Sequence, residues 1–296
     1  MVVLTGHTDP VNAVDFSHDG RWLASAGDDG AVRLWDVALQ TGMVRIDWGA
    51  KWVFAVAFSP DGQSMAVGTD SSLLLLRETN GAWKPHQQWK DHHSWVKAVA
   101  FDRDGQLLVS GGEDGIIRVW DAQHRRKSPL RIFNAHIGPI RSIAISPDGM
   151  RIAAGGVSGL GMWKPNDPEP VLFHRLRDAD AKSIAFSHDG NLLLAAVTRC
   201  VLKVNWRSGE AKEILEDRSR SFRCLAAAPA EPLILAGRED GSVLSWDYEA
   251  NAQRQVYSWH TGVVNSVAFH PSGLMAASGG DDFAVCYWNL NPTDPA

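Results

Sequence analysis

The sequence repeats itself, and the period of this repeat limits the possible folds more than any other feature. Six tryptophans and one leucine recur every 40 to 44 residues: Trp35, Leu76, Trp120, Trp163, Trp206, Trp246 and Trp288. Periods of 20–50 residues are typical of solenoids, propellers and similar arrays. Units of about 42 residues fill all 296 positions, so we expect one domain at 1–296. Its seven repeat cores are expected at about 6–36, 48–77, 91–121, 134–164, 176–207, 217–247 and 259–289.

Each unit has the pattern of a small antiparallel sheet. In the third unit, residues 96–101, 107–110 and 116–120 are β-rich runs separated by Asp104-Gly105 and Asp114-Gly115. Asp-Gly pairs tolerate positive φ and are typical of hairpin turns. Three short strands are marginal on their own. The pattern therefore predicts an array in which copies of this sheet pack against one another.

The units resemble the WD40 repeat family, whose repeats start near a Gly-His pair and end with Trp-Asp. Gly6-His7 matches the start, and Trp35-Asp36, Trp120-Asp121 and Trp246-Asp247 match the end. The resemblance covers the whole chain. It implies an all-β fold, a seven-bladed β-propeller of four-stranded antiparallel blades.

The N-terminal residues are expected to close this ring. We interpret β-rich runs between the units, at 44–48, 130–133, 171–176 and 255–259, as outer strands. No such run follows Trp288, whereas residues 1–4 are β-rich and precede the first unit. We predict that they form the missing outer strand of the last blade and remove a free sheet edge.

The composition limits the classes of partner and the cellular compartment that we expect. A net charge of −5 provides no basic field, so we expect no nucleic acid. The first residues lack the features of a signal peptide, and no apolar run is long enough to cross a membrane. Cys200, Cys224 and Cys286 lie far apart in sequence and are interpreted as buried thiols in a reducing compartment. We expect a cytoplasmic chain that is free-standing or fused to, or acting with, an effector domain.

Four histidines at unit starts are interpreted as structural. The family resemblance implies a buried hydrogen-bonded chain of His, Ser or Thr, Asp and Trp. The candidates are His7, Asp29 and Trp35, then His92, Asp114 and Trp120, then His136 and Trp163, then His260, Asp282 and Trp288. Ser25, Ser110 and Ser278 lie one strand pair from the expected place, which leaves the hydroxyl member open. Units two, five and six have Gly49, Arg177 and Arg218 in place of the His, so we expect them to rely on packing.

Motifs for chemistry are missing from the sequence. It contains no P-loop, no H-E-x-x-H, no C-x-x-C and no G-x-S-x-G. We therefore predict neither an enzyme nor a bound metal or cofactor. Asp28-Asp29 and Asp281-Asp282 are interpreted as solvated rim acids rather than a cation site. The basic run at 124–127 is interpreted as a solvated loop, with a phosphate or acidic-partner contact as the alternative.

Function is therefore expected on a face of the disc. In WD40 propellers, the residues three and five positions after the repeat His, together with the residue before the turn Asp, form a rim that binds partners. Alternation along a strand keeps the first two on one side. The implied binding set is Asn12, Asp28, Trp52, Phe54, Trp95, Lys97, Glu113, Arg141, Lys182, Arg223, Asn265 and Asp281. The same positions in the remaining cases are Pro10, Thr69, Pro139, Asp180, Ser221, Glu239 and Val263.

Aromatic residues beside Arg and Lys are typical of binding hot spots. We therefore expect a scaffold or sensor module that binds a protein or peptide of acidic or mixed charge on this face. Trp52 and Trp95 could instead be partly buried between blades. The alternative function is a small-ligand site at the channel mouth, where Trp52, Phe54 and Trp95 would hold a methylated amine by cation–π attraction.

Overall fold

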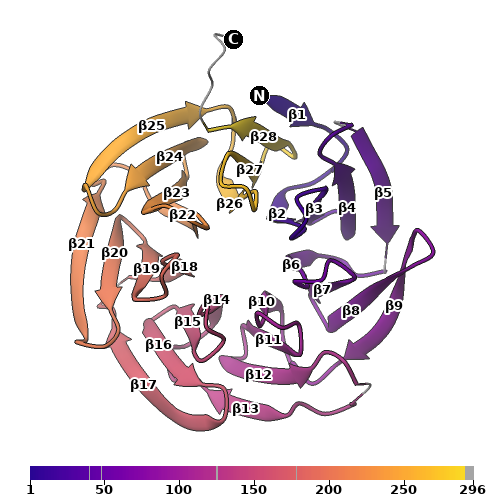
Figure 1. The fold of residues 1–296 in the computed structure, drawn as a ribbon, viewed down its shortest axis with the longest axis horizontal. Coiled ribbons are helices and arrows are strands. Elements are labelled where there is room, and N and C mark those ends of the chain that lie inside the picture. Colours follow the sequence, from indigo (N-terminus) through magenta and orange to yellow (C-terminus); the bar gives the residue numbers. More distant parts are fainter. Residues whose placement is uncertain (40, 48, 125, 178, 291–296) are drawn as a thin grey trace.

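The chain forms a closed ring of seven sheets around a central axis (Figure 1). The computed structural model describes residues 1–290 except for residues 40, 48, 125 and 178. In this part of the chain, each sheet contains four antiparallel strands. The predicted all-β, seven-bladed β-propeller is confirmed. Trp48 at the end of one expected outer strand lies outside the described residues, and so does Arg125 of the basic run.

The blades follow one another along the chain. Blade one contains β2 (Val11–Phe16), β3 (Trp22–Gly27), β4 (Ala31–Asp36) and β5 (Thr41–Asp47). Blade two contains β6 (Val53–Phe58), β7 (Ser64–Thr69), β8 (Leu73–Thr79) and β9 (Ala82–Trp89). Blade three contains β10 (Val96–Phe101), β11 (Leu107–Gly112), β12 (Ile116–Asp121) and β13 (Arg131–Asn134). Blade four contains β14 (Ile140–Ile145), β15 (Ile152–Gly156), β16 (Gly159–Lys164) and β17 (Asp167–Arg175).

The remaining blades complete the circle. Blade five contains β18 (Ala181–Phe186), β19 (Leu192–Val197), β20 (Cys200–Asn205) and β21 (Glu210–Glu216). Blade six contains β22 (Phe222–Ala227), β23 (Leu233–Arg238), β24 (Ser242–Asp247) and β25 (Ala252–Ser258). Blade seven contains β26 (Val264–Phe269), β27 (Met275–Gly280), β28 (Val285–Asn289) and the N-terminal strand β1 (Val2–Leu4).

The N-terminal strand closes the ring as predicted. β1 pairs antiparallel with β28 through Val2 with Tyr287, Val3 with Cys286, and Leu4 with Val285. Figure 1 shows β1 as the outer strand beside β28. The side chain of Leu4 is buried, with 4% of its surface exposed. The last blade is therefore built from both ends of the described chain, and β28 has no free edge.

Apolar side chains between neighbouring blades form the core. Trp120, Trp163 and Trp288 are almost completely buried there, and Leu76 fills the corresponding place in blade two. Trp206 and Trp246 are only half-buried. Because each blade packs against two neighbours, burial of apolar surface holds the ring together in every sector. In the described part of the chain, no helix has the length and apolar character needed to cross a bilayer.

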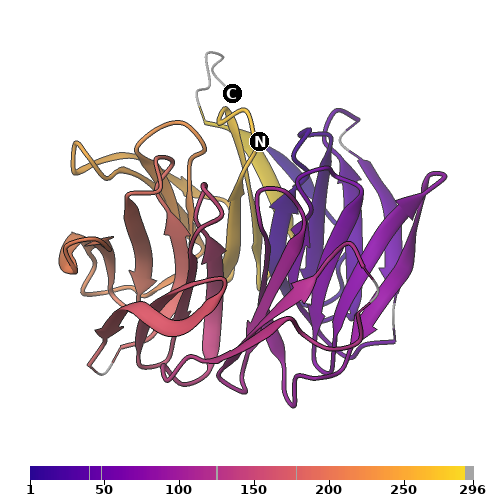
Figure 2. The same ribbon diagram turned by 60° about the horizontal axis from the view of Figure 1, so that its bottom comes forward.

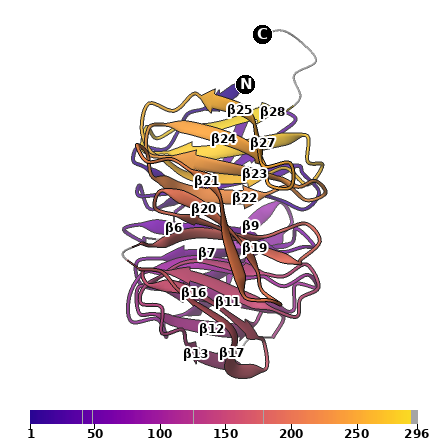
Figure 3. The same cartoon turned by 90° about the vertical axis from the view of Figure 1, so that its left-hand side faces the viewer.

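The loops collect on the two faces of the disc (Figures 2 and 3). In each blade the chain enters the innermost strand from one face, and the turn after the second strand returns to that face. We call this the mouth face, and it carries residues 5–10 and the turn that follows β3. The opposite face carries the turns that follow the first and third strands.

One carboxylate links blades one and two near the axis. Asp15 in β2 accepts a hydrogen bond from the backbone N–H of Phe58 in β6, at 2.8 Å between N and Oδ2. Ala stands at this place in β6 and in β10 (Ala57 and Ala100), so the link is a local feature of blade one. Burial raises the pKa of Asp15 to about 7, against the opposing effect of that hydrogen bond.

This pKa predicts a pH-dependent stability. In the unfolded chain Asp15 ionises near pH 4, whereas in the folded protein its pKa is raised to about 7. The free energy of unfolding is therefore highest below pH 4 and falls as the pH rises from 4 to 7. Asp15→Asn retains an acceptor for Phe58 but cannot ionise. We expect Asp15→Asn to be more stable than the parent by roughly 4 kcal/mol at pH 8, with the difference disappearing near pH 4. Urea titrations of both proteins across this range measure it, and a constant difference would contradict the assignment.

Candidate functional site

A β-bulge in every blade positions the residues that surround the channel. In each innermost strand the register with the second strand shifts after the first pair, so one residue has no partner across the sheet. Bulges redirect the side chain of the extra residue. The seven bulged residues are Asn12, Phe54, Lys97, Arg141, Lys182, Arg223 and Asn265.

These seven residues line one hollow at the end of the channel. Together with Asp180 they surround a volume of about 380 Å³, which we call the channel mouth. They are the residues predicted from the fifth position after the repeat His. Of the residues at the third position, only Asp180 lines the hollow. The two positions are therefore not equivalent, because the bulge breaks the alternation from which we expected both on one side.

The cations of the mouth come from four consecutive blades. Arg141 forms an ion pair with Glu113 of the preceding blade. Glu239 is shared by Lys182 at 3.6 Å and Arg223 at 4.0 Å. Burial, and next the repulsion of Arg223, lower the pKa of Lys182. Two acids of the predicted rim, Glu113 and Glu239, are thus brought together with three of its four cations.

An aromatic cluster lies beside the mouth at blades two and three, and one of its members, Phe54, lines the hollow. The ring centroids of Trp52 and Trp95 lie 5.6 Å apart, and those of Phe54 and Trp95 lie 5.2 Å apart. Trp95 has 38% of its surface exposed, whereas Trp52 and Phe54 are half-buried. The alternative that Trp52 and Trp95 are partly buried therefore holds for Trp52 but not for Trp95. The three rings bury one another and leave Trp95 open to solvent.

Lys97 lies against this cluster. Its Nζ atom is 3.4 Å from the centroid of Phe54 and 4.7 Å from that of Trp95. Burial lowers the pKa of Lys97 to about 8, and Glu113 partly opposes that shift. The aromatic faces attract the ammonium ion, so the side chain is held at the boundary between the aromatic cluster and the hollow.

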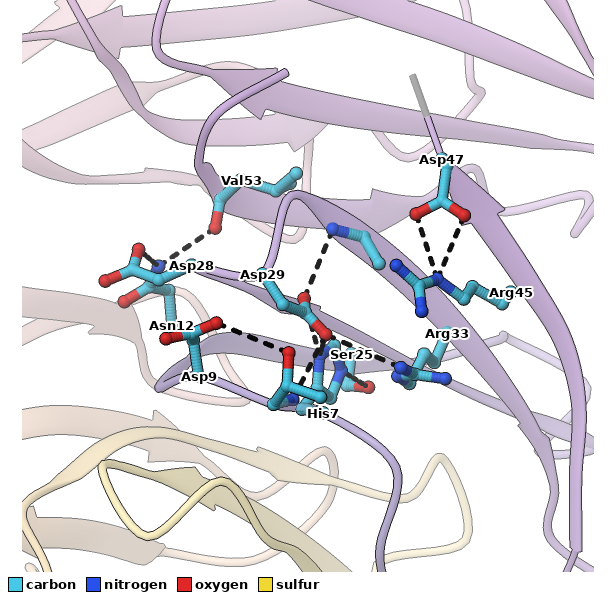
Figure 4. Close-up of polar contacts among 12 residues, drawn as sticks. His7, Asp9, Asn12, Ser25, Asp28, Asp29, Arg33, Arg45, Asp47 and Val53 are labelled. Carbon is cyan, nitrogen blue, oxygen red and sulfur yellow. Dashed lines mark hydrogen bonds and ion pairs between the residues drawn. The ribbon is translucent and has the colours of Figure 1, made fainter. Parts of the chain in front are cut away.

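Amide–carboxylate pairs occupy the mouth at blades seven and one. Asn12 donates to Asp28 at 2.7 Å and to the carbonyl of Val53 in the next blade at 3.0 Å (Figure 4). Asn265 repeats this with Asp281 at 2.7 Å and the carbonyl of Val11 at 3.2 Å. Each amide thus ties its own rim acid to the neighbouring blade.

The buried His network is more complete than the sequence indicated. In blade one, His7 Nδ1 lies 2.9 Å from Asp29 Oδ1, and His7 Nε2 lies 2.7 Å from Ser25 Oγ. Trp35 donates to the same Ser25 hydroxyl at 2.9 Å. Figure 4 shows Asp29 and Ser25 next to His7. Blade three repeats the network with Ser110 as the hydroxyl, so Ser25 and Ser110 are the members that sequence reasoning left open.

Protonation follows from this geometry. Burial lowers the pKa of His7 more than Asp29 raises it, so the ring is neutral. Burial works to raise the pKa of Asp29, but the hydrogen bond from His7 holds it below its usual range. His7 therefore donates from Nδ1 to the carboxylate and accepts the Ser25 proton at Nε2. This is a satisfied core group that locks the loop before β2.

The other blades depart from this network in different ways. In blade seven, His260 bonds Asp282 at 2.8 Å and Ser278 at 2.7 Å, while the ring of Trp288 packs against Trp259 at 4.8 Å. The structural role predicted for His136 is wrong, because its side chain is exposed. Blade four has Ser158 where blades one, three, six and seven have the turn Asp, so a buried His136 would have no carboxylate partner.

Blade six has Arg218 in place of the repeat His, but a different arginine, Arg238, makes the contact with the loop before β22. The expectation that blade six relies on packing alone is wrong. Arg238 at the end of β23 is buried and lies 3.5 Å from Asp217, with its guanidinium 5.3 Å from the ring of Phe222. This pair joins the turn to the loop before β22, as the His–Asp pair does elsewhere.

Comparison with known proteins separates the blades that have a repeat His from two of the blades that lack it. The sequence model described as WD domain, G-beta repeat matches residues 1–36, 45–75, 83–121, 127–160 and 251–289, together more than half of the chain. The chain belongs to the WD40 repeat family. Residues 161–250 lie outside these matches. They include all of blade five and the first three strands of blade six, the two blades in which Arg177 and Arg218 replace the repeat His of WD40 blades.

Curated relatives are similar over nearly the whole chain. WD repeat-containing protein 55 of Pongo abelii is 26% identical over 95% of this chain and 74% of its own length. Ribosome biogenesis protein BOP1 of Mus musculus is 25% identical over 96% of this chain but only 38% of its own length. WD repeat-containing protein 26 homolog of Arabidopsis thaliana is 24% identical, over 98% of this chain and 50% of its own length.

Proposed function

We propose that the chain is a protein-interaction module that holds a protein or peptide partner on its mouth face. The observation that carries this proposal is the cluster of Trp52, Phe54 and Trp95 at the rim of a hollow lined by cations. A partly exposed Trp gains little from folding alone. Aromatic anchors next to Arg are the composition of interface hot spots.

The relatives support a scaffold role. One relative's name assigns it to ribosome biogenesis, and proteins named as WD repeat-containing cover the same length of this chain. A rigid disc with a recognition surface on one face suits a chain that holds partners together. The bulges give this surface its precision, because the seven bulged residues that line it are fixed on strands rather than on loops.

Substitution of the aromatic anchors tests this function. We expect Trp52→Ala and Trp95→Ala each to weaken partner binding by about 2 kcal/mol, roughly thirtyfold, because each removes a large desolvated contact. Affinity capture from cells with the parent and both variants identifies the partner, and titration with the purified partner measures the loss. Circular dichroism confirms that the variants fold.

Trp206→Ala is the matched control. Trp206 is half-buried in the turn between β20 and β21, on the face opposite the mouth, where its indole donates to the carbonyl of Gly190 at 2.9 Å. We expect this variant to bind the partner as the parent does. Equal binding by Trp52→Ala, Trp95→Ala and the parent would exclude the mouth face.

A methylated-amine site at the same rings is the second candidate. The geometry of Trp52, Phe54 and Trp95 favours it, but the ammonium of Lys97 already lies 3.4 Å from the Phe54 centroid. A ligand cation would have to displace this side chain. Titration with trimethyllysine peptides, followed by Trp fluorescence, distinguishes this function from protein binding, since only this function requires the methyl groups.

We also propose a reducing, cytoplasmic environment. The three cysteines are free thiols, with Cys224 and Cys286 buried and Cys200 half-buried. Burial raises the pKa of Cys224 to about 12, so its thiol is unreactive. Localisation of the tagged full-length protein in its own cells tests this proposal, and secretion of the protein would contradict it.

A further inference from the structure

Charged side chains on the mouth face form two concentric rings of opposite sign. The inner ring is made of the bulged residues and contains four cations that line the hollow: Lys97, Arg141, Lys182 and Arg223. The outer ring is made of the residues that follow the second strand of each blade. Five of these are acids: Asp28, Asp70, Glu113, Glu239 and Asp281.

One backbone hydrogen bond sets the place of every outer-ring residue. The N–H of Asp28 donates to the carbonyl of Pro10 at 2.9 Å, and the N–H of Asp70 donates to Trp52 at 3.2 Å. Glu113, Glu239 and Asp281 make the equivalent bond in their own blades. Asp70 is thus the blade-two member of this ring, whereas we had predicted Thr69, which is buried one residue earlier.

The inner ring has one cation without a counter-ion. Arg141 is paired with Glu113, and Lys182 and Arg223 share Glu239. Within the described residues, Lys97 has no carboxylate at ion-pair distance and contacts aromatic rings instead. Asp180 is the one acid that lines the hollow, and it directly precedes β18 of blade five, which carries Lys182. A negative charge near Lys97 would therefore meet an uncompensated ammonium ion.

The outer ring has acids without cations. Asp28 and Asp281 accept hydrogen bonds from Asn12 and Asn265, but in the described part of the chain neither forms an ion pair. Oδ1 of Asp70 is buried and accepts no hydrogen bond from the described residues. These three acids belong to the adjacent blades seven, one and two, so the unpaired negative charge lies on one side of the mouth.

Resting on the proposed function, we infer that the partner inserts one carboxylate side chain into the hollow towards Lys97 and carries basic residues beside it that reach the outer ring. A volume of about 380 Å³ admits a Glu side chain and its backbone but not a folded domain. One free ammonium favours a singly charged group, because a phosphate dianion would meet Asp180, Glu113 and Glu239 with twice the charge. A uniformly acidic segment would be repelled by Asp28 and Asp281.

Three synthetic peptides of equal length test this charge order. Each is acetylated and amidated and contains one Phe for the aromatic cluster. The first has a central Glu with an Arg two residues away on either side, the second exchanges the two charges, and the third has a central Glu with Ser in place of Arg. Fluorescence of the Trp residues at the mouth reports binding at low salt, where charge contacts are not screened.

We expect the first peptide to bind at least about tenfold more tightly than the second. Lys97→Met should remove the preference for a central Glu, whereas Lys97→Arg, which keeps the charge, should retain it. The double variant Asp28→Asn/Asp281→Asn should weaken the first peptide and leave the third unchanged. Both Asn replacements keep the shape and the hydrogen-bonding oxygen, so the folded ring is preserved.

Two results would overturn this inference. One is equal or tighter binding of the charge-reversed peptide, and the other is no binding by any of the three. If no peptide binds but partner capture still depends on Trp52 and Trp95, the inference fails and the proposed function stands. If capture is also independent of both tryptophans, the proposed function itself fails.

Discussion

Removal of residues 1–5 should lower the free energy of unfolding by roughly 3 kcal/mol and the melting temperature by several degrees. The deletion removes three residue pairs between β1 and β28 and the buried side chain of Leu4. It also leaves β28 with an unpaired edge, which is a template for association with another chain. Scanning calorimetry measures the shift, and light scattering after heating measures the aggregation.

Two point variants separate these effects. Leu4→Ala removes only the buried apolar contact and should cost about 2 kcal/mol. Val3→Ala changes a side chain with 46% of its surface exposed, so it should change stability little. An unchanged melting temperature on deletion of residues 1–5 would show that β1 does not close the ring.

Gly112→Ala should destabilise the protein by about 3 kcal/mol or more. A Cβ atom at Gly112 would lie 1.9 Å from the carbonyl oxygen of Trp95 and 3.1 Å from Cα of Val96. Both are backbone atoms at the start of β10, so a side-chain rotation cannot relieve the overlap. The start of β10 would therefore have to move away from Gly112, and this movement would also shift Trp95 and Lys97 at the mouth. Chemical denaturation measures the stability, and partner binding should weaken in parallel.

Gly62→Ala is the control for the substitution itself. Gly62 has a φ of 68° and no atom within 4 Å of the Cβ position. It should therefore cost only the strain of positive φ, about 1 kcal/mol. Equal losses for Gly62→Ala and Gly112→Ala would contradict the close approach of backbone that we describe.

The architecture was predictable because it depends on spacing. The seven apolar positions from Trp35 to Trp288 are separated by nearly equal intervals, and only a repeating fold satisfies that pattern. The role of β1 followed from a missing strand after Trp288. These features rest on patterns of many residues, which single exceptions such as Leu76 do not disturb.

The His network was harder to predict because it depends on pairs of residues. His136 has the right spacing but no carboxylate partner, so it turns to solvent. A usable signal was the pairing of a repeat His with a turn Asp, which His7, His92 and His260 have in Asp29, Asp114 and Asp282. The glycine at the end of the second strand is not such a signal by itself, because Gly156 stands at that place in blade four, where His136 is exposed.

The seven bulged residues were all among the residues predicted for the rim, but for an incomplete reason. Alternation along a strand does not explain why Phe54 and Lys97 line the hollow while Trp52 and Trp95 flank it. The bulge after the first pair of each innermost strand explains it, and a bulge has no fixed sequence signature when its extra residue is not Gly. Shared backbone geometry in all seven blades, rather than residue type, creates the mouth.

Site-specific photo-crosslinking tests the central claim most directly. A benzophenone amino acid replaces Trp95 at the mouth in one protein and Trp206 on the opposite face in another, and each is irradiated in cells before capture and mass spectrometry. We predict covalent adducts with the partner from position 95 and none from position 206. Adducts from position 206 with none from position 95 would contradict a partner site on the mouth face.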